Sequence, residues 1–191
     1  LFHLLINSTS SKSDVSINCA TNNAVQKYRL THVVVPFHFN QLESVMNSIS
    51  KWSKYKPCLN IESRSIMPKI IFYIGYSTKN EVKINDIESK LRELIPHLEC
   101  FSNGDQIDLV AFKMPSNSDN RIYGSTLMFE NMLQKNHELF KDLSYIFMME
   151  ADAKPIRSDW LNAIERDIGY NQFWIRGCAY FGDNPIDLAR T

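Results

Sequence analysis

The most informative segment of the chain reads LSYIFMMEADAKPIRSDWL, residues 143–161. Its first seven residues are largely apolar and predict a strand that is buried on both faces, as in a parallel sheet. Glu150 and Asp152 follow this strand directly. Ser158 then predicts the N-cap of a helix that ends at Gly169. A buried strand that leads through a loop into a capped helix is typical of α/β proteins.

The same alternation of strand and helix signals extends back to residue 29. Short apolar runs predict further strands at Thr31–Phe37, Lys69–Tyr76, Asp108–Met114 and Phe173–Phe181. Apolar residues at helical spacing predict three helices between them: one capped by Asn40, one that begins near Ile84 and stops at Pro96, and one from about Tyr123 to Lys141. Because parallel neighbours need crossover connections, we predict an α/β fold with a mainly parallel sheet and helices on both faces.

Composition and charge exclude several classes of protein. The 191 residues include 21 Lys and Arg and 21 Asp and Glu, so the net charge is zero and no basic field favours nucleic acid. The apolar segment Leu1–Ile6 is far shorter than the roughly 20 residues that span a bilayer, so we expect no membrane span within this chain. The segment is either the end of a removed anchor, which would place the protein on the lumenal side of a secretory compartment, or a first strand; a cytoplasmic location stays open.

The cysteine and histidine positions predict no metal site. Cys19, Cys58, Cys100 and Cys178 lie far apart and lack the two-residue spacing of zinc ribbons and dithiol centres. We expect free buried thiols, the usual state of isolated cysteines, although an even number permits two disulfides. The five histidines show no ligand spacing either. The sequence also lacks a nucleophile elbow, a phosphate-binding loop and a dinucleotide glycine triplet, which argues against hydrolases, P-loop NTPases and dehydrogenases.

Two acidic residues stand where α/β proteins bind ligands. Glu150 and Asp152 follow the carboxyl end of a predicted strand, and ligands bind beyond such ends in open α/β sheets. On an extended segment, two carboxylates separated by one residue point to the same side. This arrangement suits a divalent cation that takes hard oxygen ligands and keeps several waters. The alternative is structural: Asp152 begins a turn before Pro155, and Glu150 pairs with a Lys or Arg.

The segment MMEADAKPIRSDWL, residues 148–161, resembles the metal-binding signature of nucleotide-sugar glycosyltransferases of the GT-A type. The Val-Val-Pro end of the first strand, the helix start RIYGSTLMFENML and the later FWIRGCAYFGD occur in the order that this family uses. The chain looks most like divergent members from large DNA viruses and protists, over residues 29–183. One departure is Glu150, since the usual family pattern is Asp-x-Asp.

The resemblance implies a Rossmann-like GT-A sheet and a division of the chain. Residues 1–28 would be a polar lead-in or stem, and residues 29–191 the nucleotide-sugar-binding domain. In the family, the segment after the fifth strand supplies much of the acceptor site, but only residues 182–191 remain here. We therefore expect a domain that is truncated at its carboxyl-terminal end. Asp183 is the best remaining acid for a catalytic base; the alternative is a turn residue.

The resemblance also assigns roles to individual residues. Asp152 would bind Mn²⁺ or Mg²⁺ directly and be catalytic, and Glu150 would contact the ribose or a metal-bound water. The start of the third helix would place backbone N–H groups near the diphosphate. Residues implied to hold the nucleotide-sugar donor, a UDP-sugar more than a GDP-sugar, are Pro36, Phe37, His38, Tyr76, Ser77, Arg121, Tyr123 and Gly124. For Phe37 and His38 the alternative is a core aromatic, and for Tyr76 and Ser77 an ordinary surface loop.

Three residues of the last predicted strand suit an acceptor. Trp174, Arg176 and Tyr180 alternate along it and so share one face. An aromatic ring with a guanidinium suits a sugar, so we assign this face to a glycan or glycoprotein acceptor; the alternative for Trp174 is the core. Two other functions stay open: a nucleotidyltransferase that acts on sugar phosphates, and a non-catalytic carbohydrate-binding domain.

Overall fold

A computed structural model describes residues 4–7, 29–61, 67–77, 83–117, 123–135, 145–170 and 175–176. Its strands are β1 (Leu4–Asn7), β2 (Leu30–His38), β3 (Lys69–Ser77), β4 (Leu109–Met114), β5 (Tyr145–Met148) and β6 (Ile175–Arg176). Its helices are α1 (Leu42–Ser50), α2 (Ile84–Arg92), α3 (Tyr123–Lys135) and α4 (Trp160–Tyr170). Short 3-10 turns are η1 (Phe39–Gln41), η2 (Lys51–Ser53) and η3 (Ile95–His97).

The strands form one sheet in the order β4–β3–β2–β5–β1–β6. β2 lies at its centre and pairs in parallel with β3 on one edge and with β5 on the other, and β4 continues the parallel set beyond β3. β1 pairs antiparallel with both β5 and β6. The strand order therefore reverses between β2 and β5, because the chain first builds outward to β4 and then returns to the opposite edge of β2.

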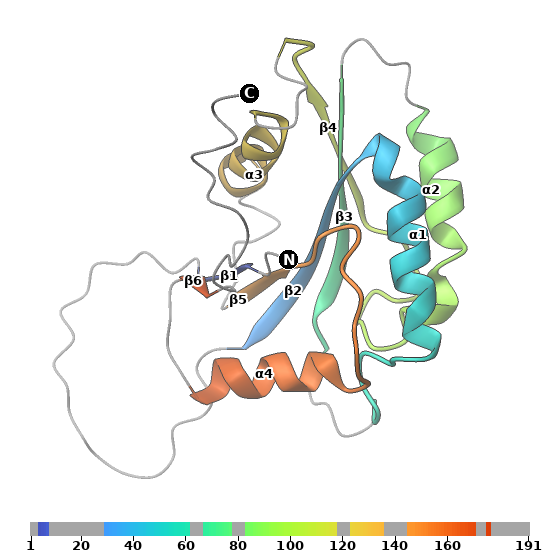
Figure 1. The fold of residues 1–191 in the computed structure, drawn as a ribbon, viewed down its shortest axis with the longest axis vertical. Helices are drawn as coiled ribbons and strands as arrows, with labels where there is room; N and C mark the ends of the chain where they lie inside the picture. Colours follow the sequence, from blue (N-terminus) through green and yellow to red (C-terminus); the bar gives the residue numbers. More distant parts are fainter. Residues whose placement is uncertain are drawn as a thin grey trace, which may run out of the picture.

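Helices cover both faces of the sheet, as Figure 1 shows for α1 and α2 on one side and α3 on the other. Side chains of β2 alternate accordingly: Val33 and Val35 belong to the core under α1, α2 and α4, and Val34 belongs to the core under α3. A strand buried on both faces must be apolar at successive positions, which is why its sequence lacks a polar alternation. The predicted α/β fold with a mainly parallel sheet is confirmed.

Two predicted helix caps are wrong. The His38 backbone N–H donates to Oε1 of Gln41 at 2.9 Å, and His38 Nδ1 accepts from the N–H of Asn40 at 3.4 Å. His38 therefore caps η1, and Asn40 lies inside this turn. At α4, the residue that directly precedes the helix is Asp159 rather than Ser158. Gln41 precedes α1 without a side-chain cap hydrogen bond, and Oδ1 of Asp159 accepts from the Leu59 N–H at 3.4 Å, so neither helix start follows the spacing of capping residues in the sequence.

The first and last predicted elements are described only in part. Leu4–Asn7 forms β1, which agrees with the alternative of a first strand for the apolar amino-terminal segment. Of the predicted strand Phe173–Phe181, the structure describes Ile175–Arg176, and this pair lies beside β1. Among the described residues, no helix has the length and apolar character needed to cross a bilayer.

Cys58 and Cys100 form a disulfide, so the expectation of free thiols is wrong for this pair. Both residues are buried and belong to the core under α1, α2 and α4. A separation of 42 residues carries no pairing signal, and the two cysteines meet only because their loops pack together at one end of the sheet. The other two cysteines, Cys19 and Cys178, lie outside the described residues.

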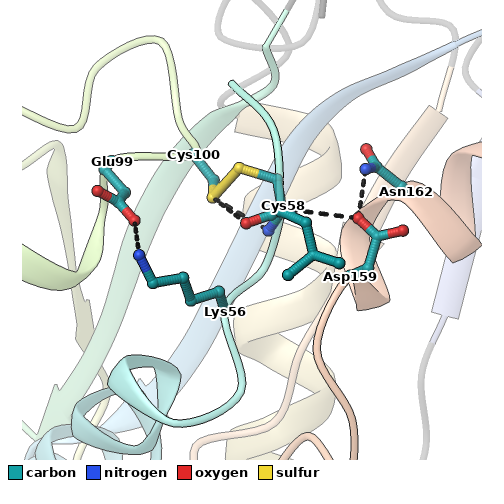
Figure 2. Close-up of a disulfide and its surroundings, with 7 residues drawn as sticks. Lys56, Cys58, Glu99, Cys100, Asp159 and Asn162 are labelled. Carbon is teal, nitrogen blue, oxygen red and sulfur yellow. Dashed lines mark hydrogen bonds and ion pairs between the residues drawn. A yellow bond between two sulfur atoms is a disulfide. The ribbon is translucent and has the colours of Figure 1, made fainter. Parts of the chain in front are cut away.

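The disulfide anchors a segment that we call the strap, residues 54–59. On one side, Lys56 forms an ion pair with Glu99 at 3.1 Å (Figure 2). On the other side, the strap carbonyls of Lys56 and Pro57 accept hydrogen bonds from the N–H groups of Asp159 and Leu161, at 2.8 and 3.0 Å. The strap therefore connects the start of α4 to the covalently fixed loop at residue 100.

We expect the Cys58→Ala/Cys100→Ala variant to lower the free energy of unfolding by about 2–4 kcal/mol. The crosslink removes loop-closure entropy from the unfolded chain, and a loop of this length falls in that range. Urea denaturation of the oxidised protein and of the variant measures the difference. Equal midpoints and slopes for the two proteins would contradict a stabilising role of the disulfide.

His32, at the start of β2, gives folding a pH dependence. Burial lowers the pKa of His32 from 6.5 to about 4, with a smaller contribution from the Lys69 charge and an opposing one from Asp108. Between these two values the unfolded chain binds more protons than the folded chain, so the free energy of unfolding should rise with pH over this window. Above it, the contribution of His32 should be constant.

We therefore expect His32→Gln to reduce the slope of stability against pH between about 4 and 6.5, relative to the unsubstituted protein. Denaturation in urea at half-unit steps of pH measures both curves. The carboxylates titrate equally in both proteins, so their contribution cancels in the difference. Parallel curves over this range would show that His32 does not contribute.

Candidate functional site

A cavity of about 730 Å³ opens at the carboxyl ends of β2 and β5. These are the two strands between which the strand order reverses, and open α/β sheets bind ligands in the crevice at such a point. The walls come from the end of β2 and η1, from the end of β4, from α3, and from the end of β5 with the segment that follows it. Four separate stretches of the sequence therefore meet at one cavity.

Pro36 marks the place where β2 and β5 separate. The Val34 carbonyl accepts a hydrogen bond from the Met149 N–H at 2.9 Å, so it faces β5. Residues two apart in a strand present their backbone groups to the same neighbour, and the nitrogen of Pro36 therefore also faces β5. Proline has no N–H to donate, so the ladder cannot continue there. The end of the ladder leaves the crevice between the two strands open.

The acidic pair lies on a turn at this opening. The Ala153 N–H donates to the Glu150 carbonyl at 3.0 Å, which closes the turn, and Ala151 and Ala153 are buried beneath it. The expectation of an extended segment is therefore wrong here. Burial of both alanine side chains requires the backbone to turn between them. Glu150 is half-buried, Asp152 is exposed, and both line the cavity.

The donor-site residues predicted on the strands divide into two groups. Pro36, Phe37 and His38 line the cavity. Phe37 is only 1% exposed and belongs to the core, so it both packs in the core and lines the cavity. Tyr76 and Ser77 end β3 instead, beside β4, and do not line this cavity.

The start of α3 reaches the cavity through Gly124 and Ser125. Tyr123 is the first residue of this helix, and Arg121 lies outside the described residues. The helix is held against the sheet by the Tyr73 hydroxyl, which donates to Oδ1 of Asn131 at 2.6 Å. The amino-terminal end of α3, where backbone N–H groups lack helical partners, therefore borders the same hollow as the acidic turn.

Methionines form much of the inner wall, which sequence reasoning missed. Met114, Met128, Met132 and Met148 all line the cavity. They come from β4, α3 and β5, and a methionine in an apolar run is indistinguishable from any core residue. Gly75 inside β3 was a usable signal for this wall, because a glycine within a strand often marks a place where another part of the chain packs closely against the strand. A Cβ at this position would overlap the Met128 sulfur and lie 3.1 Å from Cε of Met114.

The predicted acceptor residues are only partly described. Arg176 lies in β6, which β1 separates from β5. Trp174, Tyr180 and the proposed base Asp183 lie outside the described residues.

The acidic turn brings two carboxylates, Glu150 and Asp152, to the lining of the cavity. In the described part of the chain, neither Glu150 nor Asp152 forms an ion pair with a Lys or Arg. No group of three His, Cys, Asp or Glu side chains suited to a metal occurs among these residues. A cation on the two carboxylates would take its remaining oxygen ligands from water and from a bound phosphate, as Mg²⁺ commonly does.

Comparison with protein-family models, with curated proteins and with solved structures found no match to this chain.

We expect Gly75→Ala to destabilise the fold by about 1–3 kcal/mol, because the new methyl group overpacks the contact with Met128. In a Met128→Ala background the same substitution should cost less than half as much, since the obstructing sulfur is gone. A double-mutant cycle in urea measures the coupling. An equal cost in both backgrounds would mean that Gly75 is required for another reason.

Proposed function

We propose that this protein is a metal-dependent glycosyltransferase of the GT-A type. It would transfer a sugar from a nucleoside-diphosphate sugar, UDP-linked rather than GDP-linked, to a glycan or glycoprotein acceptor. The observation that carries the proposal is the cavity at the strand-order reversal, which joins Glu150 and Asp152 to the end of β2 and the start of α3. The resemblance of residues 148–161 to the family signature supports the same function.

The dimensions of the cavity suit a nucleotide sugar. Small-molecule sites occupy about 300–1,000 Å³, and this cavity has about 730 Å³. Its polar groups concentrate at the sheet edge, where Glu150, Asp152 and His38 lie, and its inner wall is apolar. Such a division suits a ligand with a charged diphosphate and a flat base, because the ring can pack on thioether and aromatic surfaces.

Each wall has a role in this proposal. Asp152, exposed on the turn, would be the direct ligand of Mn²⁺ or Mg²⁺, and the half-buried Glu150 would contact the ribose or a water of the cation. A bound cation would offset the negative charge that develops on the departing diphosphate. The N–H groups at the start of α3 would donate to the phosphates or the donor sugar.

The acceptor half of the proposal concerns the carboxyl-terminal residues. Trp174, Arg176 and Tyr180 would contact the acceptor, and Asp183 would take the proton from its attacking hydroxyl. Removal of this proton raises the nucleophilicity of the oxygen as it attacks the anomeric carbon. These assignments rest on the alternation along residues 174–180 and on the family resemblance.

Calorimetric titration with UDP and with GDP, each with and without Mn²⁺, tests the donor site. We expect Mn²⁺-dependent binding of UDP that Asp152→Asn weakens by more than about tenfold, since a charged oxygen ligand is lost. Asp105→Asn is the matched control, because it removes an exposed carboxylate outside the residues that line the cavity. Absence of binding of either nucleotide under both conditions would sink the proposal.

Glu150 substitutions separate a chemical role from a structural one. Glu150→Asp keeps a carboxylate and restores the usual family pattern, so UDP should bind nearly as tightly as before. Glu150→Ala removes the oxygen ligands and should weaken binding more. Equal losses in the same titration would indicate that the side chain length, and not its charge, matters.

The products identify the reaction class. A sugar transferase incubated with a nucleotide sugar and acceptor releases the nucleoside diphosphate. A nucleotidyltransferase that acts on sugar phosphates would instead release or consume pyrophosphate, so chromatography of the products separates the two enzymes.

A further inference from the structure

A second cavity, of about 520 Å³, lies between the end of β5, the loop at residues 153–157 and α4. At β5, the side chain that lines it lies on the opposite face of the strand from the one that lines the first cavity. Its β5 residue Phe147 and the following Met149 belong to the core under α1, α2 and α4, whereas the β5 residue of the first cavity, Met148, packs against the core under α3. The two cavities also share no lining residue.

The floor of the second cavity is apolar. Phe147, Trp160 and Ile164 line it, and the small Ala163 leaves space beside them. Trp160 is fixed in place by ring contacts with Trp52 and Phe147, at centroid distances of 5.2 and 6.2 Å. A fixed indole offers contact area at little cost in conformational entropy, which favours a ligand with a flat face.

The wall carries two exposed cations. Lys154 and Arg157 are exposed and line the cavity, and neither forms a salt bridge within the described part of the chain. Asp167 is the acid among the lining residues, and it has an interaction of its own. The two exposed cations outnumber the one carboxylate of this lining and so favour an anion, and a guanidinium binds phosphate or carboxylate with two donors.

We propose that this cavity is a second ligand site for a small phosphorylated or carboxylated molecule with a flat apolar face. Lys154 and Arg157 bind the anionic group, and Trp160 and Ile164 contact the ring. The volume lies within the range of small-molecule sites. The site does not depend on the proposed transferase, because it uses neither Glu150 nor Asp152.

Phenyl phosphate is the probe, titrated calorimetrically in EDTA so that no cation bridges it to the acidic turn. We expect binding by the unsubstituted protein, and a loss of about tenfold or more in Lys154→Ala/Arg157→Ala, because two charge-assisted contacts are removed. Lys51→Ala/Lys113→Ala is the matched control, since it removes two exposed cations outside the lining residues and should bind as before. Absence of binding by the unsubstituted protein, or equal affinity in all three proteins, would overturn the proposal.

A cavity-filling variant tests the contribution of the apolar floor. Ala163→Leu should weaken phenyl phosphate about tenfold by occupying the ring space, and should leave the weaker binding of inorganic phosphate unchanged. Equal affinities of the unsubstituted protein for the two phosphates would show a surface charge effect only and would overturn the site. Asp152→Asn should bind phenyl phosphate normally, so failure of the proposed transferase leaves this test unaffected.

Discussion

β2 hydrogen-bonds to a parallel neighbour along both edges and is covered by side chains on both faces. The backbone N–H and C=O groups of its buried residues Val33, Val34 and Val35 must therefore find partners in β3 or β5. This constraint fixes both neighbours, separates the helices into two layers, and brings the ends of β2 and β5 to one edge. Pro36 then ends the pairing with β5. The strand at the centre of the core therefore also borders the cavity.

The parallel strands were predictable because their burial on both faces leaves unbroken apolar runs such as Lys69–Tyr76. The disulfide was not, since Cys58 and Cys100 approach each other only through packing of two loops. The acidic segment also differs from its expectation. The sequence indicates acids at a strand end, but the turn that carries them depends on burial of Ala151 and Ala153 against residues distant in the chain.

The candidate site was predictable where strand ends supply it. Glu150 and Asp152 follow from the rule that ligands bind beyond the carboxyl ends of parallel strands, whereas Pro36 and His38 come from the family resemblance; all four line the cavity. The methionine wall does not, because a thioether looks the same whether it faces a core or a cavity. The second cavity gave no sequence signal either. Its cations and its aromatic floor come from a loop, a strand and a helix, and each segment alone is ordinary.

The antiparallel placement of β1 bears on how the chain is made. Leu4–Asn7 pairs with β5 and β6, and the whole of residues 8–144 separates it from the first of these partners. Because the chain is synthesised from its amino terminus, the backbone groups of Leu4–Asn7 have no strand partner until β5 has left the ribosome. β6 pairs with β1 and follows β5 in the chain, so it joins the sheet afterwards. The last steps of assembly therefore depend on a strand that is made long before its partners, and a chaperone that shields it would protect the growing chain from edge-to-edge aggregation.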